Sequence, residues 1–142
     1  MKKVIFLLVL LCFLAIWQYR NYQDIFIERY KCNQADRYLC EIIGNEIKDY
    51  EAESGIEIKT VCFYKDQVET WADKGYHNSE LNVRAQSCGW SKVNAMNYYL
   101  DKDYVMGDSL KEYTEHFSQY NWDTYADEQL IFEGDTLHIC SY

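Results

Sequence analysis

The chain opens with an uncharged apolar run, from Val4 to Trp17, that directly follows two lysines. Such a run has to leave water, because burying apolar surface is worth about 25 cal/mol per Å². Positive charge ahead of an apolar run is common to secretory signal peptides and to membrane anchors with a cytoplasmic N-terminus. The fate of MKKVIFLLVLLCFLAIWQYR therefore decides where the rest of the chain folds.

Three fates are open to this segment: cleavage, lipidation or retention as an anchor. Cleavage requires small residues in an A-x-A-like pattern, whereas the run ends in the bulky residues 16–20. Lipidation at Cys12 would require a small residue before the cysteine, where Leu11 stands. We therefore expect residues 1–20 to remain as an uncleaved signal-anchor, with residues 4–19 in the membrane.

The apolar run is short for a membrane helix. Its fourteen residues, Val4 to Trp17, would cover about 21 Å of a hydrocarbon core that is about 30 Å thick. Trp17 and Tyr19 compensate, because aromatic rings favour the membrane interface. Lys2 and Lys3 then lie inside, which predicts a single pass through the cytoplasmic membrane with residues 21–142 outside as one domain.

The charge of the chain excludes one class of partner. Lys2 and Lys3 account for two of the 14 basic side chains, so the remaining chain carries 12 basic and 23 acidic side chains, a formal charge of −11. A domain this acidic is repelled by phosphate backbones. We expect no nucleic-acid partner.

Periodicity predicts an α+β domain. Helical spacing of apolar residues runs over 23–53 and stops at Gly55, while IEIKTVCFYKD (56–66) and ELNVRAQS (80–87) are typical of strands. Two shorter helices are expected, one capped by Ser91 and one over 109–120, before a C-terminal hairpin over 129–142. This order favours a small, mostly antiparallel sheet with helices on one face, preceded by a membrane helix that continues into the long helix.

Five cysteines lie beyond the apolar segment and form no C-x-x-C pair. His138 and Cys140 lie two residues apart, so they share one face of a strand, and Cys62 on a neighbouring strand would complete three metal ligands. The spacing matches no known zinc pattern. A cross-strand disulfide between Cys62 and Cys140 explains the same residues more simply, so we predict that disulfide and neither a metal nor another cofactor.

The sharpest hint of chemistry is AQSCGWSKVNAMNYYL, in which Cys88 precedes a predicted helix. A helix N-terminus lowers the pKa of a nearby thiol, and His138 on a strand would serve as its base. The SCGW element is similar to the Cys-Gly element of papain-type peptidases, without their Cys-Trp spacing. A small cysteine hydrolase of cell-wall material that uses Cys88 and His138 is the alternative function, but a structural cysteine is the commoner case.

Aromatic residues raise the possibility of sugar binding. Trp90 and Trp122 would be platforms for sugar rings in an envelope protein, although aromatic side chains more often fill a core. The acidic residues follow no calcium-loop pattern.

Three stretches, FYKD, NVRAQSCGWSKVNAMNYYL and YADEQLIFEGDTLHICSY, carry a resemblance. They resemble the extracytoplasmic C-terminal domain of polytopic glycosyltransferase-like membrane proteins of Gram-positive bacteria. The resemblance covers about residues 33–142 and implies an α+β domain at the cell envelope. It carries no glycosyltransferase activity across, because this chain has at most one membrane segment. We therefore expect a non-catalytic accessory or interaction domain with a membrane-protein or glycan partner.

Overall fold

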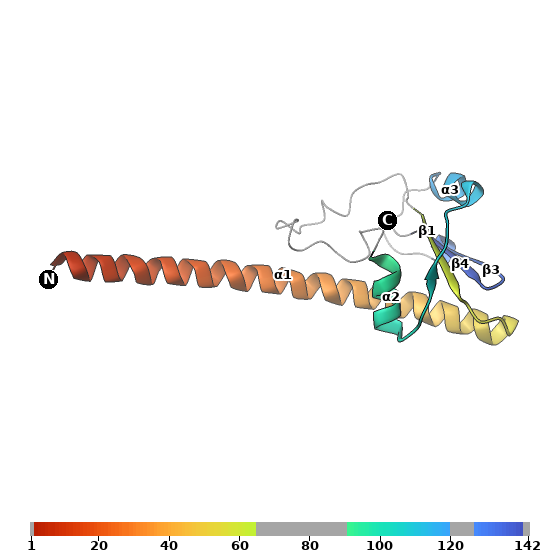
Figure 1. Cartoon of the computed structure of the whole chain (residues 1–142), viewed down its shortest axis with the longest axis horizontal. Helices are drawn as coiled ribbons and strands as arrows, with labels where there is room; N and C mark the ends of the chain where they lie inside the picture. The colour runs from red at the N-terminus through yellow and green to blue at the C-terminus, as the bar shows by residue number, and fades with distance from the viewer. Residues whose placement is uncertain (1, 65–90, 120–126, 141–142) are drawn as a thin grey trace.

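The computed structural model describes residues 2–64, 91–119 and 127–140 of the chain. They form the helices α1 (Lys2–Ser54), α2 (Lys92–Leu100) and α3 (Lys111–Phe117), a single 3-10 turn, η3 (Asp127–Gln129), and the strands β1 (Thr60–Tyr64), β2 (Val105–Met106), β3 (Leu130–Glu133) and β4 (Thr136–Cys140). Figure 1 shows that α1 projects far beyond a small α+β domain, which is built around its C-terminal end. The predicted fold class is confirmed.

The first helix is unbroken over 53 residues, which corresponds to a length of about 80 Å. The prediction that the apolar segment continues into the long helix is therefore confirmed. The helix ends where the sequence predicted: Gly55 has a φ of 72°, and its N–H donates to the carbonyl of Glu51 at 3.0 Å. The Ser54 hydroxyl accepts a hydrogen bond from the N–H of Ile56, which turns the chain away from the helix axis.

The sheet has the strand order β2-β1-β4-β3 and is mixed. Strand β1 runs parallel to both β2 and β4, and only β3 and β4 are antiparallel. The prediction of a mostly antiparallel sheet was therefore wrong. The predicted hairpin is confirmed, with Gly134 at a φ of 59° in the two-residue turn between Glu133 and Thr136. The predicted strand over 80–87 lies outside the described residues.

The helices cover both faces of this sheet, not one face as the sequence suggested. Val61 and Phe63 of β1 and Leu137 and Ile139 of β4 pack with buried residues of α1 and α2 in the main core. The alternate residues of the same strands, including Cys62 and Tyr64, pack against α3 in a second cluster around Phe117. Because both faces are covered, β1 and β4 are buried almost throughout.

Helices α1 and α2 approach each other closely at Gly44 of α1. A Cβ placed on this glycine would come within 2.5 Å of Cδ2 of Leu100 in α2. The close contact gives this glycine a packing role that opposes its helix-propensity cost of about 1 kcal/mol relative to alanine. The Tyr50 ring stacks on Phe132 at 4.5 Å between centroids, and its hydroxyl donates to the carbonyl of Gly134, so the end of α1 also holds the hairpin.

The contact at Gly44 predicts a coupling between two substitutions. In a Leu100→Ala background, Gly44→Ala should raise the free energy of unfolding by about 1 kcal/mol, the difference in helix propensity. In the native background the same change has to displace Leu100 and should gain less, or destabilise the domain. Urea unfolding of the four variants in detergent, followed by circular dichroism, measures the coupling. Equal effects in both backgrounds would contradict the packing described.

Candidate functional site

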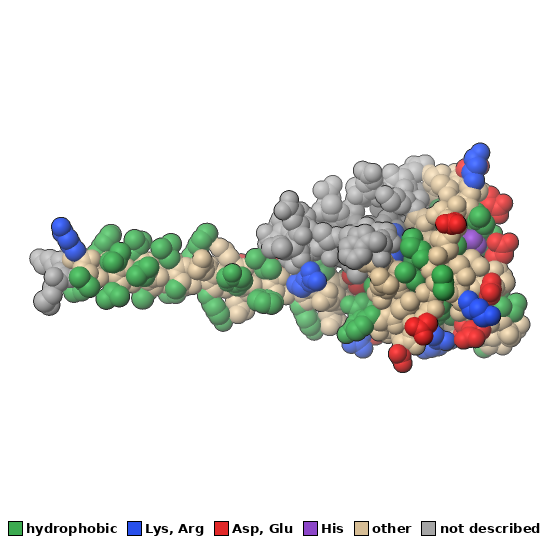
Figure 2. Space-filling view, in the orientation of Figure 1, with side chains coloured by type: hydrophobic (Ala, Val, Ile, Leu, Met, Phe, Trp, Pro, Cys, Tyr) green, Lys and Arg blue, Asp and Glu red, His purple; other side chains and the backbone are tan. Residues whose placement is uncertain are grey.

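The N-terminal part of α1 has no protein neighbour among the described residues. Its large apolar side chains between Val4 and Trp17 are between 45% and 71% exposed, and Figure 2 shows them on all visible sides of the isolated helix. In the described part of the chain, α1 alone is long and apolar enough to cross a membrane. Exposure of this much apolar surface in water would be strongly unfavourable, so an apolar phase around it is the physical expectation.

An aromatic stripe continues from this segment toward the domain. It consists of Tyr19, Tyr22, Phe26 and Tyr30, each between 61% and 69% exposed. Their spacing of three, four and four residues places them on one face of the helix. Cys32 and Asp36, which are buried, lie on a different face of α1. The stripe is therefore an exposed apolar surface on the helix between the apolar segment and the domain.

The second candidate is the His138 cluster, made of His138, Tyr64, Tyr113 and Glu133. His138 on β4 is only 1% exposed. Its Nδ1 lies 2.8 Å from the hydroxyl of Tyr64, and its ring lies 4.0 Å from the ring of Tyr113. The Tyr113 hydroxyl donates to Glu133 Oε2 at 3.1 Å, and the same oxygen lies 3.4 Å from His138 Nε2.

The tautomer of His138 decides the direction of its hydrogen bond with Tyr64. The Tyr64 oxygen accepts from the N–H of Leu110 at 3.1 Å, and the same hydroxyl can either donate to or accept from His138 Nδ1. On the other side of the ring, Nε2 faces the Glu133 carboxylate. That contact is too long and poorly directed for a good hydrogen bond, which leaves Nε2 buried without a partner among the described residues.

The electrostatics of the cluster favour the neutral imidazole. Burial lowers the pKa of His138, while the nearby Glu133 raises it to a lesser extent. Burial also raises the pKa of the Tyr64 hydroxyl and that of the Cys62 thiol, so both remain protonated at neutral pH. A protonated thiol is a poor nucleophile and a poor metal ligand. The contacts of Tyr64 with Leu110 and of Tyr113 with Glu133 connect α3 to the sheet around the buried His138.

The predicted disulfide between Cys62 and Cys140 is not formed. The two cysteines do share the face that α3 covers, as the sequence indicated. However, Cys62 lies opposite His138 and Cys140 lies opposite Tyr64, so the two cysteines are diagonal neighbours rather than a cross-strand pair. Within the described ranges, no group of three or more His, Cys, Asp or Glu side chains is arranged to hold a metal.

Three predicted site residues, Cys88, Trp90 and Trp122, lie outside the described residues. The hydrolase pair therefore has one described member, His138, and both nitrogens of its ring face groups of the protein itself. The hydrolase and the sugar platform remain predictions. No protein-family model, curated protein or solved structure matches the chain.

Sequence reasoning found His138 but missed Tyr64, Tyr113 and Glu133. Period-two alternation was a usable signal, because Tyr64 lies two residues from Cys62 and therefore shares its face of β1. Tyr113 carried no such signal, because the side of the sheet that α3 covers depends on contacts distant in sequence.

The buried neutral imidazole predicts a stability that depends on pH. The pKa of His138 is lowered in the folded state from its ordinary value of 6.5. The unfolded chain therefore binds the proton at higher pH, so the stability tied to neutral His138 is complete above pH 6.5 and is lost as pH falls through the folded-state pKa. The difference in unfolding free energy between the native chain and His138→Gln should shrink below pH 6.5. The control His116→Gln, a histidine outside the cluster, should keep the native acid slope. An unchanged slope in His138→Gln would contradict the assignment.

Proposed function

We propose that the chain is a single-pass membrane protein whose acidic domain serves outside the cytoplasmic membrane as a non-catalytic accessory or interaction module of the cell envelope. The observation that carries the proposal is the continuity of α1. Its first turns are apolar and exposed, and its last turns fill the core of the domain. Because one continuous helix belongs to both parts, the apolar segment is built into the same element as the core of the domain. This continuity supports a permanent anchor.

The outward orientation is supported by charge. Lys2 and Lys3 precede the apolar run, and positive charge favours the cytoplasmic side. The rest of the chain is acidic, which suits a domain that is not drawn to anionic lipid headgroups. The resemblance to an extracytoplasmic domain of glycosyltransferase-like membrane proteins is in keeping with the same placement.

The proposed partner is another protein of the same membrane. Phe26 lies nine residues beyond Trp17, or about 13 Å along the helix, and Tyr30 lies further out. The headgroup layer adds only about 5–8 Å on each side of the hydrocarbon core, so the outer half of the aromatic stripe stands in water. A neighbour anchored in the same bilayer passes through this layer and is placed to cover the stripe.

Orientation is tested on membranes. Proteinase K added to intact spheroplasts should degrade the domain, whereas inverted vesicles should protect it, because the anchor holds the domain outside. Mass spectrometry of the membrane-bound protein should recover residues 1–20. Protection in spheroplasts would overturn the orientation, and a soluble product lacking residues 1–20 would overturn the anchor.

The partner surface is tested by photo-crosslinking in living cells. A benzoylphenylalanine at Phe26 should form an adduct with an integral membrane protein, and the control at Asp49, an exposed position on the same helix within the domain, should not. Serine substitutions at Tyr22 and Tyr30 should remove the adduct. An adduct of twice the chain mass would instead identify a second copy. Equal adducts from both positions would contradict a partner at the stripe.

A further inference from the structure

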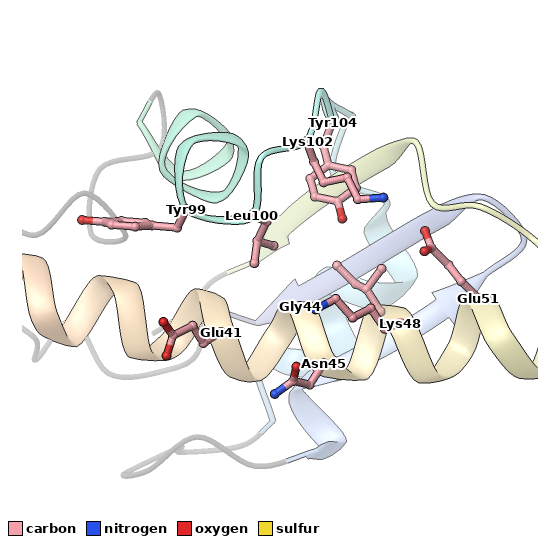
Figure 3. A pocket seen from close by; sticks show the side chains of 10 residues that line it. Glu41, Gly44, Asn45, Lys48, Glu51, Tyr99, Leu100, Lys102 and Tyr104 are labelled. Atoms are coloured by element: carbon pink, nitrogen blue, oxygen red, sulfur yellow. The ribbon is translucent and has the colours of Figure 1, made fainter.

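A pocket of about 340 Å³ lies between α1 and α2, on the part of α1 that belongs to the domain. Figure 3 shows side chains from α1 facing side chains from α2 and from the segment after it across this space. The pocket is lined by Glu41, Gly44, Asn45, Ile47, Lys48, Glu51, Tyr99, Leu100, Lys102 and Tyr104. Its volume is within the range of about 300–1,000 Å³ that small-molecule sites occupy.

Part of the pocket lining is apolar. Gly44, Ile47 and Leu100 belong to it, and a side chain at Gly44 would meet Leu100. The ring of Tyr99 lies at one end of the view in Figure 3 and also belongs to the lining. These residues suit an apolar or aromatic body.

Tyr104 supplies a polar group to the wall of the pocket. The residue is 6% exposed, and its backbone is fixed by two hydrogen bonds to the Asn97 side chain, at 2.8 and 3.0 Å. Its hydroxyl points into the pocket in Figure 3 and has no hydrogen-bond partner among the described residues. A hydroxyl that faces the pocket in this way is placed to donate to a ligand. Burial and nearby carboxylates raise the pKa of Tyr104 to about 12, which keeps that proton in place.

The carboxylates that line the pocket have hydrogen-bond donors in the protein, whereas the lysines that line it have no ion-pair partner in the described part of the chain. Both carboxylates already accept hydrogen bonds from the protein: Glu41 from Arg37 at 2.8 Å, and Glu51 from the N–H of Ile58 at 2.9 Å. Lys48 and Lys102, by contrast, form no ion pair within the described part of the chain. The lining holds two carboxylates and two ammonium groups, so its formal charge is zero. Lys48, Lys102 and the Tyr104 phenol are the donors left to bind an incoming acceptor group, and the two ammonium groups bind an anionic acceptor best.

We propose that this pocket binds a small molecule that carries a carboxylate or phosphate group on an apolar or aromatic body. The anionic group lies between Lys48 and Lys102 and accepts a hydrogen bond from Tyr104, and the body packs on Leu100 and the Tyr99 ring. Gly44 lies 27 residues beyond Trp17, or about 40 Å along the helix. Lipid headgroups in the anchoring membrane do not reach that far, so the ligand comes from solution.

The test uses the full chain in detergent micelles and phenyl phosphate as the probe, with isothermal titration as the measurement. Phenyl phosphate should bind saturably. Inorganic phosphate, which lacks the apolar body, should bind more weakly, and phenethylamine, a cation with the same ring, should not bind. The absence of saturable phenyl phosphate binding, or equal binding of phenethylamine, would overturn the proposal.

Two variants locate the site. Lys48→Gln combined with Lys102→Gln should weaken phenyl phosphate binding at least tenfold, because both cations are removed. Lys59→Gln combined with Lys111→Gln changes the net charge equally, on lysines outside the pocket, and should leave affinity within about twofold. Tyr104→Phe keeps the ring, and therefore the packing, and should weaken binding about threefold to tenfold, the usual worth of one hydrogen bond. Equal losses in the two lysine pairs, or unchanged affinity in Tyr104→Phe, would overturn the assignment.

Discussion

The fold outside the apolar segment depends on the packing of the last turns of α1 against one face of the sheet. Leu39, Ile43 and Ile47 of this helix form the main core together with β1, β4 and α2. A helix in a folded protein gains most of its stability from burial of this kind rather than from intrinsic propensity. The same helix, some twenty residues earlier, has no core to pack against and is apolar on all sides. Helix α1 therefore requires two apolar environments, one around its N-terminal part and one in the core of the domain. Its backbone continues as one helix from the first environment to the second.

Covering both faces of the sheet removes the polar groups of His138 and Tyr64 from water, which costs free energy. The hydrogen bonds of the His138 cluster offset part of that cost. The α1 face is filled by Val61, Leu137 and other aliphatic side chains, whereas the α3 face carries His138 and Tyr64. Polar groups removed from water in this way need partners inside the protein. The Tyr64 hydroxyl provides one for His138 and another for the backbone at the start of α3. A histidine that looks like a catalytic base in the sequence is thus held by the network that docks a helix.

The features that sequence reasoning predicted correctly are the local ones. Gly55 and Gly134 mark the end of α1 and the hairpin turn, because left-handed backbone is a property of single residues. The parallel pairing of β1 with β4 joins segments more than seventy residues apart, and no local pattern encodes it. The prediction of a Cys62–Cys140 disulfide, which is not formed, has the same origin. Alternation placed Cys62 and Cys140 on one face, but only the register between the two strands shows that they are not opposite each other.

The pocket shows how net charge and local charge can favour different ligands. The formal charge of −9 repels polyanions such as nucleic acids, whose many phosphates interact with the surface as a whole. A small anion responds mainly to charges within a Debye length, about 8 Å at physiological ionic strength. Near the pocket, the two carboxylates accept hydrogen bonds from Arg37 and Ile58, and the Lys48 and Lys102 ammonium groups balance the formal charge of those carboxylates. The expectation of no polyanionic partner and the proposal of a small anionic ligand are therefore compatible, because they rest on electrostatics at different distances.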